Sequence, residues 1–109
     1  MKLSAIVITR NEAHNIAACL DSVAFCDERI VVDSGSTDDT IKIAEGKGAR
    51  VVHHDFAGFG AQKNFALSLA QGEWTLSLDA DERVSKELAD EILGAITQAK
   101  AQAYEMPRL

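Results

Sequence analysis

The sequence has no basic run and no excess of positive charge. Its 11 lysine and arginine residues stand against 17 aspartate and glutamate residues, which gives a formal net charge of −6 and a pI near 4.9. A nucleic-acid-binding protein needs basic side chains gathered along one face to neutralise successive phosphates. The composition therefore argues against a nucleic-acid partner, whereas a small anionic ligand carried by a metal ion remains compatible with it.

Long hydrophobic runs are absent as well. The apolar segment that follows Met1 and Lys2 extends only from Leu3 to Thr9, which is too short for the core of a signal peptide or for a membrane span. With 109 residues, 47% of them hydrophobic, the chain is long enough for one folded domain with one core. We expect a soluble domain located in the cytoplasm.

Cysteine and histidine are too few and too poorly spaced for an obvious metal or redox motif. Cys19 and Cys26 have neither CxxC spacing nor histidine partners at the spacing of a metal site, so we expect two reduced thiols in or near the core. His53 and His54 are neighbours in an extended segment and should point to opposite faces, not to one metal ion. GxGxxG and P-loop motifs are missing, which removes the argument for a dinucleotide fingerprint or a P-loop.

Apolar runs alternate with segments of helical periodicity along the whole chain. This order predicts an α/β fold with an open, mostly parallel sheet and helices on both faces. Asn11 is expected to cap the first helix and Ser85 the last, and Tyr104 to Leu109 have the pattern of a strand entrance. The expected strands are Leu3 to Thr9, Arg29 to Asp33, Ala49 to His53 and Glu73 to Asp79; the expected helices lie near residues 16–23, 38–46, 61–71 and 86–96, with a mobile glycine-rich loop at 56–60.

Two aspartates follow the last predicted strand. Asp79 and Asp81 are one residue apart, where the alternation of apolar and polar side chains stops and the chain turns. Paired carboxylates of this kind suit Mg²⁺ or Mn²⁺, which take further ligands from water and phosphate oxygens. In a chain with 17 acidic residues the Asp-x-Asp pattern alone is weak, and the alternative is a solvated acidic turn; the position at a strand end favours the metal site.

Polar residues also end the first two strands. Thr9 ends the first, and Asn11 and Glu12 follow it, either as ligand contacts or as a helix cap. Asp33 ends the second and could hold a ribose or a base edge, or else accept backbone N–H groups of its own turn. Because parallel strands end at one edge of a sheet, we expect these residues to lie near the aspartate pair. Lys63, near a helix start, could reach a phosphate or a base carbonyl, or could lie on a solvated helix face.

Taken together, four segments resemble a known family. SAIVITRNEAHNI, VVDSGSTDDT, GAQKNFAL and WTLSLDADE are similar, in order and spacing, to the nucleotide-sugar motifs of family 2 glycosyltransferases with the GT-A fold. The resemblance covers nearly all of the chain. Within that family, DSGSTDDT, QKN and DADE are most similar to bacterial transferases of the lipopolysaccharide core type.

The resemblance implies a reaction and a set of contacts. It implies inverting transfer of a sugar from a nucleotide-sugar, UDP-linked in this interpretation, with Mg²⁺ or Mn²⁺, to a lipopolysaccharide core or a related glycan or lipid-linked glycan acceptor. The enzyme would be located in the cytoplasm or at the inner face of the cytoplasmic membrane. By position, the resemblance assigns the nucleotide pocket to Thr9 and Glu12, uridine to Asp33, the base or a phosphate to Lys63, the ribose or metal to Asp79, and the metal to Asp81. Asn11 and Ser34, which stand beside these positions, are also expected to contact the substrate.

Three departures from the family pattern are informative. Ser34 stands where an acid often occurs, and Lys63 stands where arginine is frequent and could bind in a bidentate manner. The family's catalytic base is a carboxylate that lies beyond the metal motif, so we expect no catalytic residue before Leu109. Residues 1–109 are therefore interpreted as the nucleotide-sugar-binding part, without the acceptor-binding part, and such a piece is expected to be inactive alone and to self-associate.

A second hypothesis is a non-catalytic Mg²⁺-binding α/β module, such as a phosphoacceptor receiver domain. These domains also collect aspartates at a sheet edge. They need an acidic pair after the first strand and a lysine after a late strand. This chain has Asn11 and Glu12 at the first position and no lysine near the last strand, which favours the glycosyltransferase interpretation.

Overall fold

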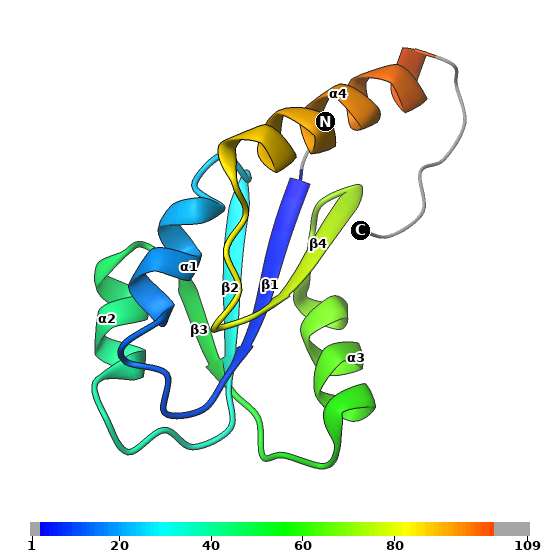
Figure 1. Cartoon of the computed structure of the whole chain (residues 1–109). Coiled ribbons are helices and arrows are strands. Elements are labelled where there is room, and N and C mark those ends of the chain that lie inside the picture. The colour runs from blue at the N-terminus through cyan, green and yellow to red at the C-terminus, as the bar shows by residue number, and fades with distance from the viewer. Residues whose placement is uncertain (1–2, 102–109) are drawn as a thin grey trace.

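In the computed structural model, which describes residues 3–101, strands and helices alternate strictly. The elements are β1 (Leu3–Thr9), α1 (Ile16–Ser22), β2 (Glu28–Asp33), α2 (Thr40–Gly46), β3 (Arg50–His53), α3 (Phe59–Leu69), β4 (Trp74–Asp79) and α4 (Lys86–Ala101). The predicted strand entrance at Tyr104 to Leu109 lies outside the described residues. Within them the predicted order of elements is confirmed (Figure 1).

The sheet is parallel throughout its described strands and has the order β3-β2-β1-β4. This confirms the predicted α/β class. The strand order runs outward in both directions from β1, which makes the gap between the ends of β1 and β4 a topological switch point, where open α/β sheets bind ligands. Receiver domains use a different order, in which the third strand pairs with the first, so the sheet does not support the receiver hypothesis.

Helices cover both faces of the sheet, as the nearly continuous apolar run of β1 requires. Side chains of β1 alternate: Leu3, Ala5 and Val7 belong to the larger core with α1, α2 and α4, whereas Ile6 belongs to the smaller core under α3 (Figure 1). The smaller core is formed by Ile6, Ile30, Val32 and Ala66, with partly buried residues of α3 around them. Both faces of the central strand are therefore shielded from water.

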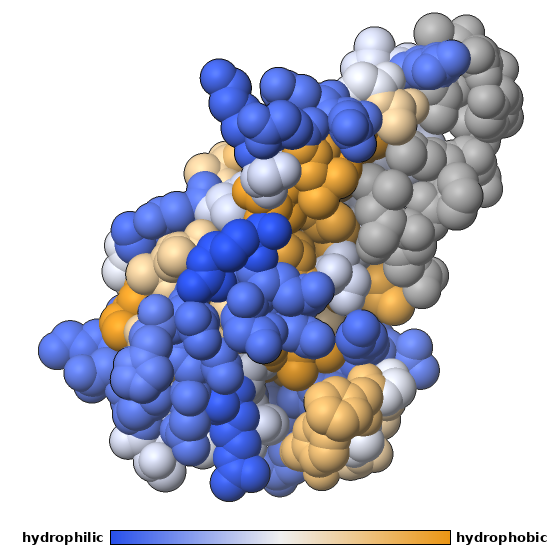
Figure 2. Space-filling model, in the orientation of Figure 1, coloured by the Kyte–Doolittle hydropathy of each residue, from blue (hydrophilic) through white to orange (hydrophobic). Residues whose placement is uncertain are grey.

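The last helix begins as predicted but is only partly covered. The Ser85 hydroxyl accepts a hydrogen bond from the Leu88 N–H at 3.1 Å, which confirms the predicted cap. Ile92 and Ile96 are buried, whereas Leu88 and Leu93 are 42% and 40% exposed. Figure 2 shows hydrophobic surface bordering this helix. No helix among residues 3–101 is both long and apolar enough to cross a membrane.

Two local predictions are wrong. Asn11 does not cap α1, which begins after Asn15; it adopts φ 54° and its Oδ1 accepts the Thr37 N–H at 2.7 Å. The segment 56–60 is not all loop, because α3 starts at Phe59, directly after Gly58. Gly58 has φ 106°, a backbone angle that glycine adopts without strain and that lets the chain turn sharply into the helix.

The two cysteines are free and buried, as predicted. Burial raises the pKa of the Cys19 thiol to about 11 and that of the Cys26 thiol to about 12. We expect a thiol reagent at pH 8 to label neither residue in the folded chain and both after denaturation, because the thiolate is the reactive form. Since unfolded thiols ionise from about pH 9, stability should also fall above that pH. Rapid labelling of the native chain at pH 8, followed by absorbance, would contradict the expected protection of the two thiols.

Candidate functional site

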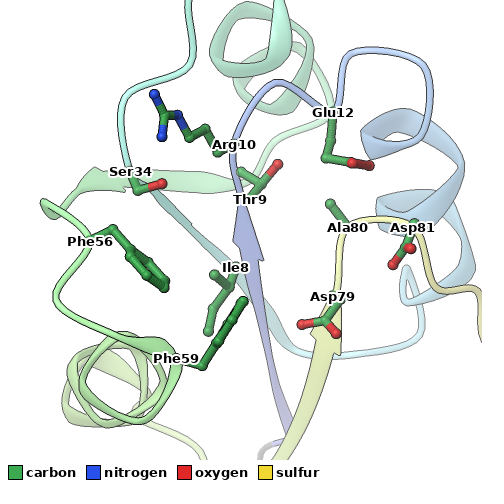
Figure 3. A pocket seen from close by; sticks show the side chains of 10 residues that line it. All are labelled: Ile8, Thr9, Arg10, Glu12, Ser34, Phe56, Phe59, Asp79, Ala80 and Asp81. Carbon is green, nitrogen blue, oxygen red and sulfur yellow. The ribbon is translucent and has the colours of Figure 1, made fainter.

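A pocket of about 370 Å³ opens at the carboxyl ends of the strands, over the switch point between β1 and β4. Its walls come from segments that are far apart in the sequence (Figure 3). It is lined by Ile8, Thr9, Arg10, Glu12, Ser34, Phe56, Phe59, Asp79, Ala80 and Asp81. Of the predicted site residues, the structure thus brings five into one pocket, namely Thr9, Glu12, Ser34, Asp79 and Asp81.

Sheet register explains why these residues meet. Thr9 lies opposite Asp33 in the β1·β2 pair, and Ile8 lies opposite Asp79 in the β1·β4 pair. Three neighbouring strands therefore end at nearly the same level. The prediction that the strand ends share one edge is confirmed.

The acidic side of the pocket is made by the turn after β4. The Glu82 carboxylate accepts the Asp79 N–H at 2.7 Å, and the Glu82 N–H donates to the Asp79 carbonyl at 2.9 Å. Glu82 thus holds the turn. Within the described residues the Asp79 and Asp81 carboxylates have no hydrogen-bond or salt-bridge partner, and both side chains are exposed. They are available to a ligand.

This donor set fits a hard divalent cation that is shared with a ligand. No group of three or more His, Cys, Asp or Glu side chains in the described part of the chain could enclose a metal by itself. Mg²⁺ and Mn²⁺ accept one or two carboxylates and complete their shell with water and phosphate oxygens. Asp79 and Asp81 fit that requirement.

Thr9 contributes a buried hydroxyl without a partner. Its side chain is 3% exposed, and Thr9 Oγ1 makes no hydrogen bond to the described residues, although Thr9 lines the pocket. A buried hydroxyl without a partner is costly and uncommon. Oγ1 is itself shielded from solvent, so a polar ligand atom would reach it only after a small shift of the pocket wall.

Glu12 is held by a brace between the loops that follow β1 and β2. Its N–H donates to Thr40 Oγ1 at 2.9 Å, and its carboxylate accepts the Asn15 side-chain amide at 3.0 Å. The same brace includes the Asn11 N–H, which donates to Ser36 Oγ at 2.8 Å. Asp38 accepts the Ala13 N–H at 3.2 Å, and a hydrogen bond from the Thr40 hydroxyl lowers the pKa of the Asp38 carboxyl. These bonds set where Glu12 enters the pocket.

Asp33 serves its own turn in the structure. The carboxylate is fully buried; Oδ2 accepts the N–H groups of Gly35 at 2.9 Å and Ser36 at 2.8 Å, and Oδ1 accepts the Ser36 hydroxyl. Gly35 has φ 118°, which the turn requires. The alternative considered from the sequence, a carboxylate that accepts N–H groups of its own turn, is therefore observed, and the contact to uridine stays a prediction.

Three predicted contact residues do not line the pocket: Asn11, Asp33 and Lys63. Asn11 is used in the loop brace, and Lys63 is exposed on α3. Their predicted ligand contacts stay predictions.

Sequence reasoning in turn missed five lining residues, Ile8, Arg10, Phe56, Phe59 and Ala80. The adjacency of Arg10 to Thr9 was the available signal for Arg10, and two phenylalanines in a glycine-rich segment were the signal for the aromatic wall.

Comparisons with known proteins match nearly the whole chain to one family. Residues 4–105 match the family described as Glycosyl transferase family 2. An uncharacterized glycosyltransferase of Rickettsia felis is 54% identical over 112 residues, covering 99% of this chain and 40% of its own length. The lipopolysaccharide core biosynthesis glycosyltransferase LpsC of Rhizobium meliloti is 37% identical over 103 residues, covering 87% of this chain and 38% of its own length.

Solved structures show the same fold. The crystal structure of residues 1–349 of S. aureus TarS has a TM-score of 0.79 and 33% identity, covering 92% of this chain and 33% of that crystallised chain. Glucosyl-3-phosphoglycerate synthase of Mycobacterium tuberculosis, crystallised with Mn²⁺, UDP and glucosyl-3-phosphoglycerate, has a TM-score of 0.65 and 32% identity, covering 72% of this chain and 33% of that protein. The chain thus spans well under half the length of these relatives.

Proposed function

Because this chain belongs to glycosyl transferase family 2, we propose that it is the nucleotide-sugar-binding part of an inverting, metal-dependent glycosyltransferase. The observation that supports this best is one pocket at the switch point, whose walls include the Asp79 and Asp81 carboxylates and the residue Thr9. Among residues 3–101, neither of these carboxylates nor the Thr9 hydroxyl has a hydrogen-bond partner. Such a pocket offers a cation site for a diphosphate and a polar contact for the nucleoside. UDP as the nucleotide is supported by the Mn²⁺ and UDP complex of the M. tuberculosis synthase.

The proposed reaction breaks the bond between the anomeric carbon and the diphosphate and forms a bond from that carbon to an acceptor hydroxyl oxygen, whose proton would pass to the catalytic base. A divalent cation held by Asp79 and Asp81 would stabilise the negative charge that develops on the leaving diphosphate. Thr9 would donate to the nucleoside, and Glu12, fixed by the loop brace, would line its polar side. Asp33 would contact uridine, Lys63 would contact the base or a phosphate, and Asn11 and Ser34 would contact the donor beside them.

The catalytic base and the residues that bind the acceptor would lie in the part of the relatives that this chain does not match. We propose a lipopolysaccharide core or related glycan as the acceptor, because LpsC carries that description, and the cytoplasm or the inner face of the cytoplasmic membrane as the place of work. The base would be a carboxylate in the part of the relatives that this chain does not match. Residues 1–109 are then the donor-binding part and are inactive alone.

Calorimetric titration tests the proposal. UDP-sugars, UDP and GDP are titrated into the folded chain with Mn²⁺, and again with EDTA. We expect binding that requires the cation and that discriminates UDP from GDP. Absence of any UDP binding with Mn²⁺, in a chain shown by circular dichroism to be folded, would contradict the proposed function.

Self-association is expected from the surface of α4 and the edge of the sheet. Leu88 and Leu93 are substantially exposed, and β4 is the edge strand beside β1 in the described sheet. Exposed apolar surface and a free strand edge favour contacts between copies. Light scattering should show a mass that rises with concentration, and replacing Leu88 and Leu93 by lysine should reduce it. A monomeric mass at high concentration would contradict the expectation.

A further inference from the structure

Two phenylalanines form an exposed aromatic wall on one side of the pocket. Phe56 is 50% exposed and Phe59 is 71% exposed, and their ring centroids are 5.1 Å apart with planes at 78°. Both line the pocket, on the side opposite Asp79 and Asp81 (Figure 3). In Figure 2 hydrophobic surface also appears near the start of α3, surrounded by hydrophilic surface. This pair is too exposed to serve the core.

The segment that carries the pair is held at both ends. The His54 ring nitrogen Nδ1 lies 2.8 Å from Gln62 Oε1, and Gln62 Nε2 donates to the His54 carbonyl at 2.9 Å. Gln62 is fully buried, and the His54 ring stacks on the Phe65 ring with their centroids 4.0 Å apart. These contacts join the end of β3 to the first turns of α3. The aromatic wall is therefore presented by an anchored segment, which lowers the entropy cost of binding a ligand to it.

The pocket has two chemically different ends. Asp79 and Asp81 lie at the end of β4, whereas Ser34 follows β2 on the other side of β1. Two strand spacings of about 4.8 Å place these ends roughly 10 Å apart. A nucleoside diphosphate has the matching polarity, with charge at one end and a flat aromatic base at the other. If the diphosphate lies at the aspartates, the base extends towards Ser34 and the phenylalanines.

We propose that Phe56 and Phe59 form the stacking surface for the nucleobase of the donor. The inference rests on the proposed function, since it takes the ligand to be a nucleoside diphosphate. Phe59 or Phe56 supplies a π-face to the base, and the two rings fix its tilt through their perpendicular arrangement. Thr9 lines the pocket between the two ends. Stacking is tolerant of base identity, so the pair supplies affinity and not selectivity.

Titrations with two ligands distinguish the contribution of the aromatic end of the pocket to binding from that of the acidic end. UDP and inorganic pyrophosphate are titrated with Mn²⁺ into the parent chain and into Phe56→Leu, Phe59→Leu and the double variant. Stacking on one aromatic side chain is worth about 5- to 150-fold in affinity. We expect the double variant to bind UDP at least about tenfold more weakly and pyrophosphate as tightly as the parent chain does. Leu93→Ala, which trims another exposed apolar residue outside the pocket, should change neither affinity.

Each result is decisive for one of the two proposals. If the parent chain binds UDP and the double variant binds it equally well, the stacking proposal is overturned and the proposed function stands. An equal loss for UDP and pyrophosphate would also overturn stacking. If the parent chain binds neither ligand, both proposals fail. Proton NMR gives a direct readout: nuclear Overhauser contacts from the phenylalanine rings to uracil H5 and H6 are expected, and contacts only to ribose or sugar protons would overturn the assignment.

Discussion

Replacing Asp81 by asparagine should weaken Mn²⁺-dependent binding of UDP by at least about 100-fold. Losing a group that merely orients a metal ligand costs 10- to 100-fold in metal affinity, so losing the charge of a ligand itself should cost no less. Asparagine keeps the size of the side chain. Because the Asp81 carboxylate is exposed and has no partner among the described residues, the fold should not change. Calorimetry with UDP and Mn²⁺ measures the effect.

Asp90→Asn is the matched control for Asp81→Asn. Asp90 is an exposed acid on α4, outside the pocket, so its replacement removes the same charge without touching the site. Thermal unfolding of both variants should match that of the parent chain. If Asp81→Asn bound UDP with Mn²⁺ as tightly as Asp90→Asn, the metal site would not involve Asp81.

Replacing Asp33 by alanine should lower the free energy of unfolding by about 3 kcal/mol. The carboxylate is fully buried and accepts three hydrogen bonds, from the N–H groups of Gly35 and Ser36 and from the Ser36 hydroxyl. Alanine would leave these donors without a charged acceptor. Asparagine keeps one carbonyl oxygen in place, and we expect Asp33→Asn to cost less than the alanine variant. Urea-induced unfolding measures both.

Asp39 provides the comparison for Asp33. It is exposed at the N-cap of α2 and makes no side-chain cap bond, so Asp39→Ala should change stability by no more than about 0.5 kcal/mol. The pair of variants also separates the two interpretations of Asp33. Should Asp33→Ala keep the stability of the parent chain while UDP binding is lost, the role as a direct uridine contact would be correct and the turn role would be minor.

The fold could be predicted because its main signals are local. The apolar run from Leu3 to Thr9 and the alternation before Asp79 each identify a strand without any knowledge of its neighbours. The alternating order of elements then leaves a parallel sheet with right-handed crossovers as the expected arrangement. The predicted edge for Thr9, Asp33 and Asp79 followed from this, and the register of β1 with β2 and β4 confirms it.

Prediction of the site was less complete, since side-chain partners depend on contacts between distant segments. The local sequence predicts that Asn11 caps a helix. In the structure its Oδ1 accepts a hydrogen bond from the Thr37 N–H, which lies 26 positions further along the chain. Phe56 and Phe59 read as part of a mobile loop, yet the bonds between His54 and Gln62 anchor that segment against the pocket. Asp33 was compatible with two roles until its hydrogen bonds to Gly35 and Ser36 were seen.

What this sequence determines by itself is which segments become strands and helices and which polar residues end the strands, because backbone periodicity and side-chain burial are set over a few neighbouring residues. The tertiary structure alone decides that β4 pairs with β1 and that the aromatic segment after β3 faces the aspartates after β4. It also decides that Thr9 lies between them with a hydroxyl that has no partner in the described part of the chain. Those outcomes depend on how whole layers pack, since hydrophobic burial is non-directional and the lowest-energy strand order emerges only when both faces of the sheet are covered at once.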